Sequence, residues 1–160
     1  MSNRRVTIYR ERLWPSPWLF VSTALVIPAS LLVFLPINQT VGVIVAAVLY
    51  LGCVVLLLLG SPVVAVTETT FVAGKARLPL SAVGAVAGFS GMDARDARGP
   101  HLDARAWLLI RGWVDPVVRV DVVDADDPTP YWIVSTRHPE AVIHAVAQAK
   151  AATLSPSKDT

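Results

Sequence analysis

The stretch richest in potentially reactive side chains runs from Ala125 to Glu140 and reads ADDPTPYWIVSTRHPE. It contains Ser135, His138 and Asp127, the residue types of a hydrolytic triad of nucleophile, general base and orienting acid. However, no G-x-S-x-G sequence surrounds Ser135, which ends a run typical of a strand. His138 precedes a proline at the expected start of a helix. We therefore expect these residues to shape the chain and not to catalyse, with a membrane-bound hydrolase as an alternative.

Metal binding is the second chemistry that this region suggests. Four aspartates are closely spaced: Asp121, Asp124, Asp126 and Asp127. A calcium loop of the EF-hand type needs a central glycine and a distal glutamate, and neither is in register here. The histidines are three: His101, His138 and His144. They lack H-x-x-x-H spacing, and the one cysteine, Cys53, is too few for a thiolate site. We expect no metal and no cofactor.

Arginines are better candidates for binding. The binding residues that we single out are Arg105, Arg119, Trp132 and Arg137. Guanidinium groups sharing a face could hold an anionic lipid headgroup or a partner carboxylate, because the planar group pairs bidentately. Arg111 belongs to the same set, and tryptophans could form a neighbouring aromatic surface. The alternative is ordinary pairing of these arginines with nearby aspartates over a tryptophan-rich core.

The composition determines where such groups can sit. Of 160 residues, 54% are hydrophobic and 16% are charged, against about 25% charged in a typical soluble domain. The deficit is local, because no Asp, Glu, Lys or Arg occurs between Arg12 and Glu68. This distribution is typical of a membrane protein. The net charge of +2 comes from arginines at the N-terminus, so the folded domain lacks the basic face that nucleic-acid binding needs.

Two apolar segments are each close to the ~20 residues that span a bilayer. We expect a basic tail over residues 1–17 and a transmembrane hairpin over 18–60, with helices at 18–36 and 40–60. A cleaved signal peptide is disfavoured because a second apolar run follows almost at once. Pro28 should bend the first helix. Gly42 and Ala46 offer a small-residue face for helix contact.

Orientation follows from the positive charges. Four arginines precede the first segment, the connecting turn has none, and Lys75 and Arg77 follow the second. The positive-inside rule therefore places both termini in the cytoplasm, in a multi-pass protein of the cell membrane.

A β-rich domain is expected over residues 61–152. Segments 63–67 and 70–74 form a hairpin, and 76–89 reads as a kinked or bulged edge strand because of Pro79 and Gly84. The polar segment 91–104 reads as a loop. Strands are expected near 105–113, 118–124 and 131–136, by their alternating apolar residues.

The last element is a helix over residues 139–152. Its core-facing stripe consists of Val142, Ala145, Val146 and Ala149, at i, i+3, i+4 and i+7. Glu140, His144 and Gln148 lie on the opposite face. Pro139 suits the first helical position, and residues 153–160 read as a disordered tail.

Two runs carry a resemblance to known families. TETTFVAGKARLPLSAVGAV, after two spans, resembles the bacterial PH-like membrane proteins. ARAWLLIRGWV, with VRVDVVDADDPTPYWIVSTRHPE, is similar to an uncharacterised family of actinobacterial membrane proteins, filed as a domain of unknown function. The resemblance covers roughly residues 9–147 and implies an integral membrane protein with a PH-like β domain closed by the C-terminal helix. It implies no activity and no catalytic residues.

These observations favour an α+β membrane protein without enzymatic activity. Its expected role is a membrane-anchored binding or scaffolding module whose partners are the bilayer and either an anionic headgroup or a membrane protein. A small subunit of a larger membrane complex is the alternative in a different class, because the spans would then mediate assembly.

Overall fold

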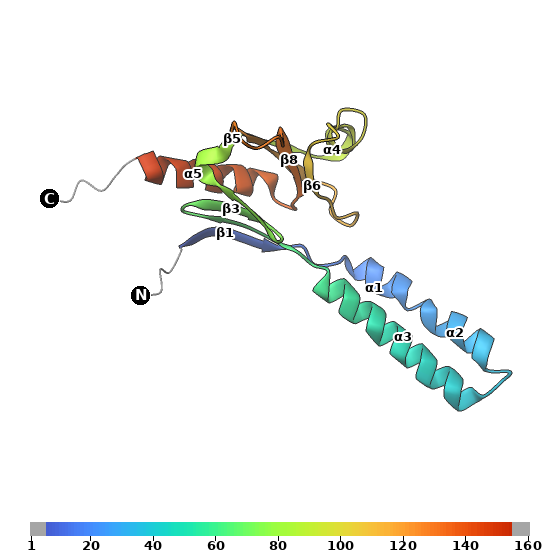
Figure 1. Ribbon diagram of the computed structural model, residues 1–160. Helices are drawn as coiled ribbons and strands as arrows, with labels where there is room; N and C mark the ends of the chain where they lie inside the picture. Colours follow the sequence, from blue (N-terminus) through green and yellow to red (C-terminus); the bar gives the residue numbers. More distant parts are fainter. Residues whose placement is uncertain (1–5, 155–160) are drawn as a thin grey trace. The chain divides into compact units, whose positions relative to one another are not determined.

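The computed structural model describes residues 6–154 (Figure 1). Its contacts divide into two units, which we call the hairpin unit, Trp14–Ser61, and the β unit, formed by the chain on either side of it. The observed class is a mixed α+β fold with two sheets. The hairpin unit is thus inserted after the first strand of the β unit.

The hairpin unit contains two helices long and apolar enough to cross a membrane, Pro17–Phe34 and Gln39–Leu59. The second is α3 (Gln39–Leu59), and it starts where Asn38 caps it. The Asn38 side-chain oxygen accepts hydrogen bonds from the amides of Thr40 (2.9 Å) and Val41 (3.2 Å). This cap ends the turn, so the helices occupy nearly the predicted ranges.

Pro28 breaks the first helix into α1 (Pro17–Thr23) and α2 (Val26–Phe34). Proline has no amide hydrogen to donate to the carbonyl of Ala24, four residues earlier. The amide of Ile27 donates to that carbonyl instead, at 3.0 Å. The predicted bend is therefore a break one turn before Pro28, and the backbone itself satisfies the freed carbonyl.

The small residues of α3 pack inside the hairpin unit. Gly42 and Ala46 are both buried, and a Cβ at Gly42 would lie 3.2 Å from the Cβ of Phe34 on α2. The small-residue face predicted for helix contact thus allows α2 and α3 to approach closely.

The first sheet of the β unit, sheet A, is antiparallel, in the order β1-β2-β3-β4. Its strands are β1 (Thr7–Arg12), β2 (Val63–Thr67), β3 (Thr70–Ala73) and β4 (Ala76–Pro79). The β2–β3 hairpin is as predicted. Within the expected basic tail over 1–17, residues 7–12 form β1, which pairs with β2 through Arg10 opposite Ala65 and Arg12 opposite Val63. This pairing joins strands more than fifty positions apart in the sequence, so local sequence patterns do not predict it.

The second sheet, sheet B, has the order β5-β7-β8-β6. Its strands are β5 (Val83–Phe89), β6 (Trp107–Leu109), β7 (Val117–Val122) and β8 (Tyr131–Ser135). β6 runs parallel to β8 and the other pairs are antiparallel. The single strand predicted over 76–89 is instead β4 and β5 in different sheets, joined by the 3-10 turn η1 (Leu80–Ala82). The predicted irregularity near Gly84 appears as a register shift between Val83 and Val86.

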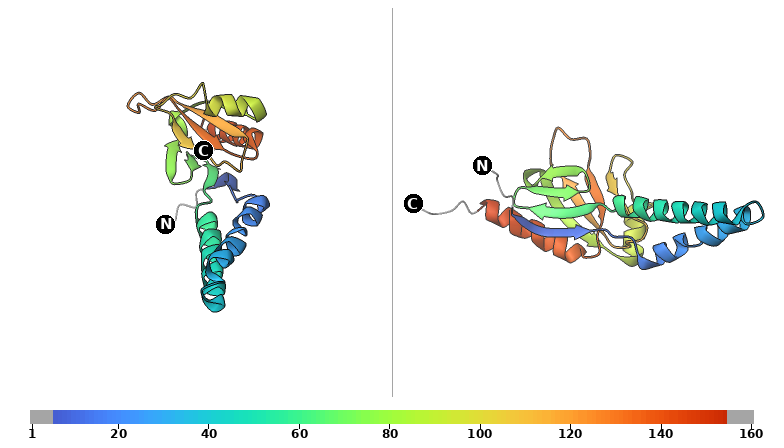
Figure 2. Two further views of the ribbon diagram at one scale, coloured as in Figure 1. Left: turned by 90° about the vertical axis from the view of Figure 1, so that its right-hand side faces the viewer. Right: turned by 90° about the horizontal axis from the view of Figure 1, so that it is seen from below.

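The main core lies where the two sheets and α5 (Pro139–Leu154) meet. Figures 1 and 2 show α5 running along the β unit, and it contacts strands of both sheets. Its buried stripe is the predicted one: Val142, Ala145, Val146 and Ala149. Glu140, His144 and Gln148 are exposed. Thr153 and Leu154 still belong to α5, and the rest of the predicted tail lies outside the described residues.

Candidate functional site

The outer face of sheet B, opposite the main core, carries a mixed set of side chains. Arg119 on β7 lies opposite Ile133 on β8, and Asp121 lies opposite Tyr131. Alternation along β8 sends Trp132 and Val134 into the main core, while Tyr131 and Ile133 join a second apolar cluster with Ala94 and Val117. Sheet B is therefore covered on both faces.

The cover on the outer face is α4 (Gly91–Arg98), in a segment that we expected to be a loop. Gly91 turns the chain into the helix with a φ of 56°, a value that favours glycine. Ala94 is its one buried residue, at 0% exposure. A helix this short and polar has little periodic signal, and packing stabilises it where propensity alone does not. That is why the sequence pattern missed it.

Asp115 holds α4 at both ends. One carboxylate oxygen accepts the amide of Gly91 (2.9 Å), and the other accepts Nη2 of Arg98 (3.0 Å). The Gly91 amide is the largest cause, and Arg98 the next, of a lowered pKa for the Asp115 carboxyl. The charged form of Asp115 is thus the one that the α4 contacts select.

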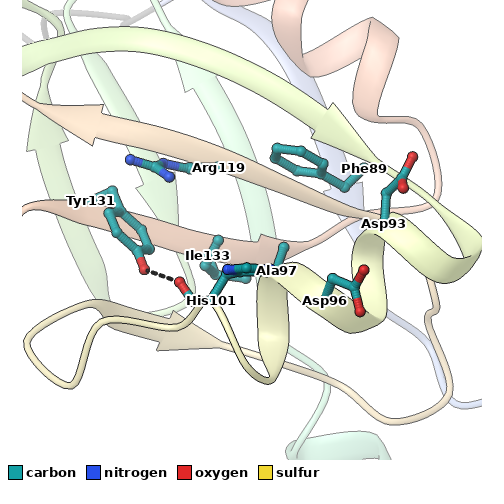
Figure 3. Close-up of a pocket in the computed structure, with 8 residues that line it drawn as sticks. All are labelled: Phe89, Asp93, Asp96, Ala97, His101, Arg119, Tyr131 and Ile133. Atoms are coloured by element: carbon teal, nitrogen blue, oxygen red, sulfur yellow. Dashed lines mark hydrogen bonds between the residues drawn. The ribbon is translucent and has the colours of Figure 1, made fainter.

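A cavity of about 280 Å³ lies between α4 and sheet B (Figure 3). Its lining residues are Phe89, Asp93, Asp96, Ala97, His101, Arg119, Tyr131 and Ile133. Its volume is just below the about 300–1,000 Å³ of common ligand pockets. It therefore suits a single side chain or a compact charged group.

Arg119 is the cation of this cavity, and its charge is already balanced. Its Nε donates to Asp121 Oδ1 at 2.8 Å, and its guanidinium carbon lies 3.9 Å from the centroid of the Tyr131 ring. This combination of ion pair and cation–π contact fixes the guanidinium plane. Asp93 and Asp96, on α4, are the remaining carboxylates in the lining.

Tyr131 also positions the loop after α4. Its hydroxyl accepts the amide of Asp103 (2.7 Å) and donates to the carbonyl of His101 (3.4 Å), the contact drawn in Figure 3. The ring is buried at 5% exposure. This one side chain thus anchors the cavity wall that bears His101.

Arg105 lies just beyond this wall and does not line the cavity. Its side chain is 69% exposed and pairs with Asp103, Nη2 to Oδ2 at 3.1 Å. The hydrogen bond from the Arg105 side chain is the main cause of a lowered pKa for Asp103. Arg105 thus forms a surface ion pair with a residue two positions away in the sequence.

Arg137 belongs to a different network, centred on Glu11. The Glu11 carboxylate accepts Thr136 Oγ1 (2.6 Å), the Tyr9 hydroxyl (3.0 Å) and the Arg137 amide (3.1 Å), and Arg137 Nη1 lies 3.6 Å away. The Glu11 side chain is only 10% exposed. Burial is the largest cause that raises the pKa of Tyr9 to about 12; the hydrogen bond with Thr136 lowers this pKa, and Glu11 raises it to a smaller extent. Arg137 therefore helps to join β1 to the start of α5.

Trp132 is a core residue and not part of an aromatic surface. It is 6% exposed, with its ring centroid 4.4 Å from that of Trp107 and 6.2 Å from that of Phe71. Of the four binding residues predicted from the sequence, only Arg119 lines the cavity. Arg105, Trp132 and Arg137 are placed elsewhere, so the expected shared face of arginines does not form.

The three residues of the hypothetical triad have separate local roles. Ser135 is fully buried, and its hydroxyl accepts the amide of Arg111 at 3.0 Å. Asp127 accepts the amide of Thr129 at 2.9 Å within the β7–β8 loop, which lowers its pKa. The His138 amide donates to Thr136 Oγ1 at 3.2 Å, before α5. Asp127 thus lies in the predicted turn and His138 next to the predicted helix start, whereas Ser135 joins the end of β8 to the backbone of Arg111.

The closely spaced aspartates also divide. Asp121 binds Arg119, and Asp124 accepts the amide of Asp126 at 3.1 Å. Among residues 6–154, no group of three or more His, Cys, Asp or Glu side chains is arranged to hold a metal ion.

The sequence pattern does not predict Asp93, Asp96 and Phe89 as cavity residues, nor Glu11 as the partner of Arg137. Asp93 and Asp96 are three positions apart, the spacing of neighbours on one helix face. That spacing was the one available signal, but it has meaning only once residues 91–98 are known to be helical. The Glu11–Arg137 contact, 126 positions apart, had no local signal.

Comparison with known proteins places most of the chain in one family. No curated protein and no solved structure matches the chain. The family described as "Protein of unknown function (DUF3093)" matches residues 8–146, which include the hairpin unit and most of the β unit. The chain therefore belongs to the DUF3093 family of proteins of unknown function.

Proposed function

We propose that this protein is a membrane-anchored, non-enzymatic binding module, whose cavity beneath α4 accepts a cationic group of its partner. The hairpin unit serves as the anchor. The two sheets closed by α5 support a PH-like assignment for the β unit, which then presents the cavity at the cytoplasmic face of the membrane.

The observation that carries this proposal is the charge balance in the cavity. Arg119 is neutralised by Asp121, while Asp93 and Asp96 add two carboxylates over a floor that includes Phe89 and Ile133. Carboxylates beside aromatic rings favour an ammonium or guanidinium group, by ion pairing and by cation–π attraction. An anionic headgroup, which the sequence suggested for the arginines, is disfavoured here by like charge.

The test uses methyl NMR on the full chain in mild detergent, because the protein contains only two methionines. Met92 adjoins Asp93 on α4 and is 71% exposed, while Met1 serves as an internal reference. Titration with N-acetyl-arginine amide should shift the Met92 methyl signal. The Asp93→Asn/Asp96→Asn double variant should lose this shift, because the carboxylates that attract the guanidinium are gone.

The matched control probes are the neutral N-acetyl-glutamine amide and the anionic N-acetyl-glutamate amide. Neither should shift the Met92 signal. An equal response to the anionic probe would overturn the cationic assignment, and so would an unchanged response in the double variant.

A subunit role in a larger membrane complex is the second candidate. Its support is Gly52 on α3, which is exposed and has no atom within 4 Å of an added Cβ. A second helix could approach closely there. Because Gly42 and Ala46 already pack against α2, this single open position favours the binding role over the subunit role.

A further inference from the structure

Exposed cationic side chains gather on one face of sheet A. Along β1, Arg10 and Arg12 are exposed, while Glu11 between them is largely buried and lies opposite Val64 of the core. Along β4, Arg77 is exposed and the next residue, Leu78, is buried. Alternation along strands therefore places these arginines on the outer face.

The strand register aligns them in adjacent rows. Arg10 pairs with Ala65, Ala65 with Val72, and Val72 with Arg77, so one cross-strand row has an arginine at each edge. In the next row Arg12 pairs with Val63, whose carbonyl accepts the amide of Gly74 at 2.7 Å. The exposed Lys75 follows at once. We call the set Arg10, Arg12, Lys75 and Arg77 the basic face.

The charge on this sheet is concentrated at one end. The rows beyond Arg10 pair Thr7 with Thr67 and Thr70 with Pro79, and the turn that follows contains Glu68. The basic face thus occupies the end of sheet A at which β1 and β2 connect to the hairpin unit. There the amide of Leu13 donates to the carbonyl of Pro62 at 2.9 Å, so both connections leave side by side.

These connections are very short. Only Leu13 separates Arg12 from the hairpin unit, and only Pro62 separates that unit from β2. A residue spans at most about 3.3–3.6 Å, so Arg12 stays within about one Debye length, near 8 Å, of the point where the hairpin begins. If the hairpin crosses the bilayer, Arg12 therefore lies near the lipid headgroups.

We propose that the basic face docks on the anionic leaflet next to the hairpin and so holds sheet A against the membrane surface. This inference rests on the membrane anchorage proposed above but is independent of the cavity. Guanidinium groups pair with lipid phosphates, and basic residues near an anionic surface gain attraction that salt screens.

The test is fluorescence quenching on the full chain in nanodiscs, in a Cys53→Ala background. A fluorophore is attached through Val72→Cys, inside the basic row, or through Met92→Cys on α4 as the reference site. Discs contain phosphatidylcholine alone or with phosphatidylglycerol, and a nitroxide-headgroup lipid is the quencher. The Val72 label should be quenched much more in the phosphatidylglycerol discs, and added salt should remove the difference.

The variant pair separates local charge from net charge. Arg10→Gln/Arg77→Gln should lower the ratio of docked to undocked molecules about fivefold for each cation removed. The matched control Arg95→Gln/Arg105→Gln removes the same charge from exposed positions outside sheet A and should leave quenching unchanged.

Three results would overturn the inference. They are equal quenching at Val72 in both disc types, a difference that salt does not affect, and equal effects of the two double variants. Failure of the proposed membrane anchorage would look different, because the protein would then not co-elute with phosphatidylcholine discs at all. That result would also contradict docking, which depends on the anchorage.

Discussion

Glu11 connects parts of the β unit that are far apart in sequence. It receives hydrogen bonds from Tyr9 and Thr136, and from the backbone of Arg137, with the Arg137 guanidinium 3.6 Å away. Charge-assisted hydrogen bonds of this kind are stronger than neutral ones. A carboxylate on β1 thus links this strand to the residues that immediately precede α5.

Replacing this carboxylate should destabilise the β unit. We expect Glu11→Ala to lower the free energy of unfolding by about 2–4 kcal/mol, because it leaves buried donors and part of an ion pair without a partner. Near-UV circular dichroism during denaturant unfolding measures the change. The control Asp103→Ala breaks an exposed pair and should produce no resolvable change. Equal effects of the two substitutions would contradict the bridging role of Glu11.

At the scale of elements, α4 is the least self-sufficient helix of the β unit. It buries one residue, Ala94, and its two ends are both bound by Asp115. Because α4 supplies Asp93, Asp96 and Ala97 to the cavity, its position determines whether the cavity exists.

We therefore expect Asp115→Ala to loosen α4 selectively. Loss of net hydrogen-bond stabilisation should speed amide hydrogen exchange in residues 91–98 by roughly three- to tenfold, with exchange in α5 unchanged. Asp124→Ala, which removes a carboxylate from the β7–β8 loop, is the control. Exchange in α4 that is the same in both variants would rule out a holding role for Asp115.

At the scale of the whole molecule, the proposed membrane anchorage implies an orientation of the chain. The turn between α2 and α3 has no Lys or Arg, while the chain before the hairpin is rich in arginine. From this asymmetry and the positive-inside rule, we propose that the turn lies outside the cytoplasm and the β unit inside it.

Cysteine accessibility tests this orientation in a Cys53→Ala background. Ile37→Cys, in the exposed turn, should react with a membrane-impermeant thiol reagent in intact cells. Met92→Cys, on α4, should react only after lysis. The chain should also stay in the membrane fraction at alkaline pH. The reverse labelling pattern would invert the topology, and extraction by alkali would contradict membrane insertion.

Local patterns in the sequence were enough to determine several of the individual elements, but not α4 or β1. Apolar length specified the two long helices, strand alternation specified the β2–β3 hairpin and the β7–β8 pair, and a 3.6-residue stripe specified the buried face of α5. These features follow from neighbours within a few positions, because backbone geometry converts short-range spacing into faces.

Only the tertiary structure decided which residues share a site. Arg119 lines the same cavity as Asp93 and Asp96 because α4 folds over sheet B. Arg137 meets Glu11 because β1 joins sheet A, although the hairpin unit separates β1 from β2 in the sequence. Such contacts form where segments far apart in the sequence pack against each other. Neither segment has a periodic pattern that identifies its partner. Four arginines on consecutive strands therefore suggested one binding face. In the folded protein they have separate partners, and the cavity is lined by carboxylates.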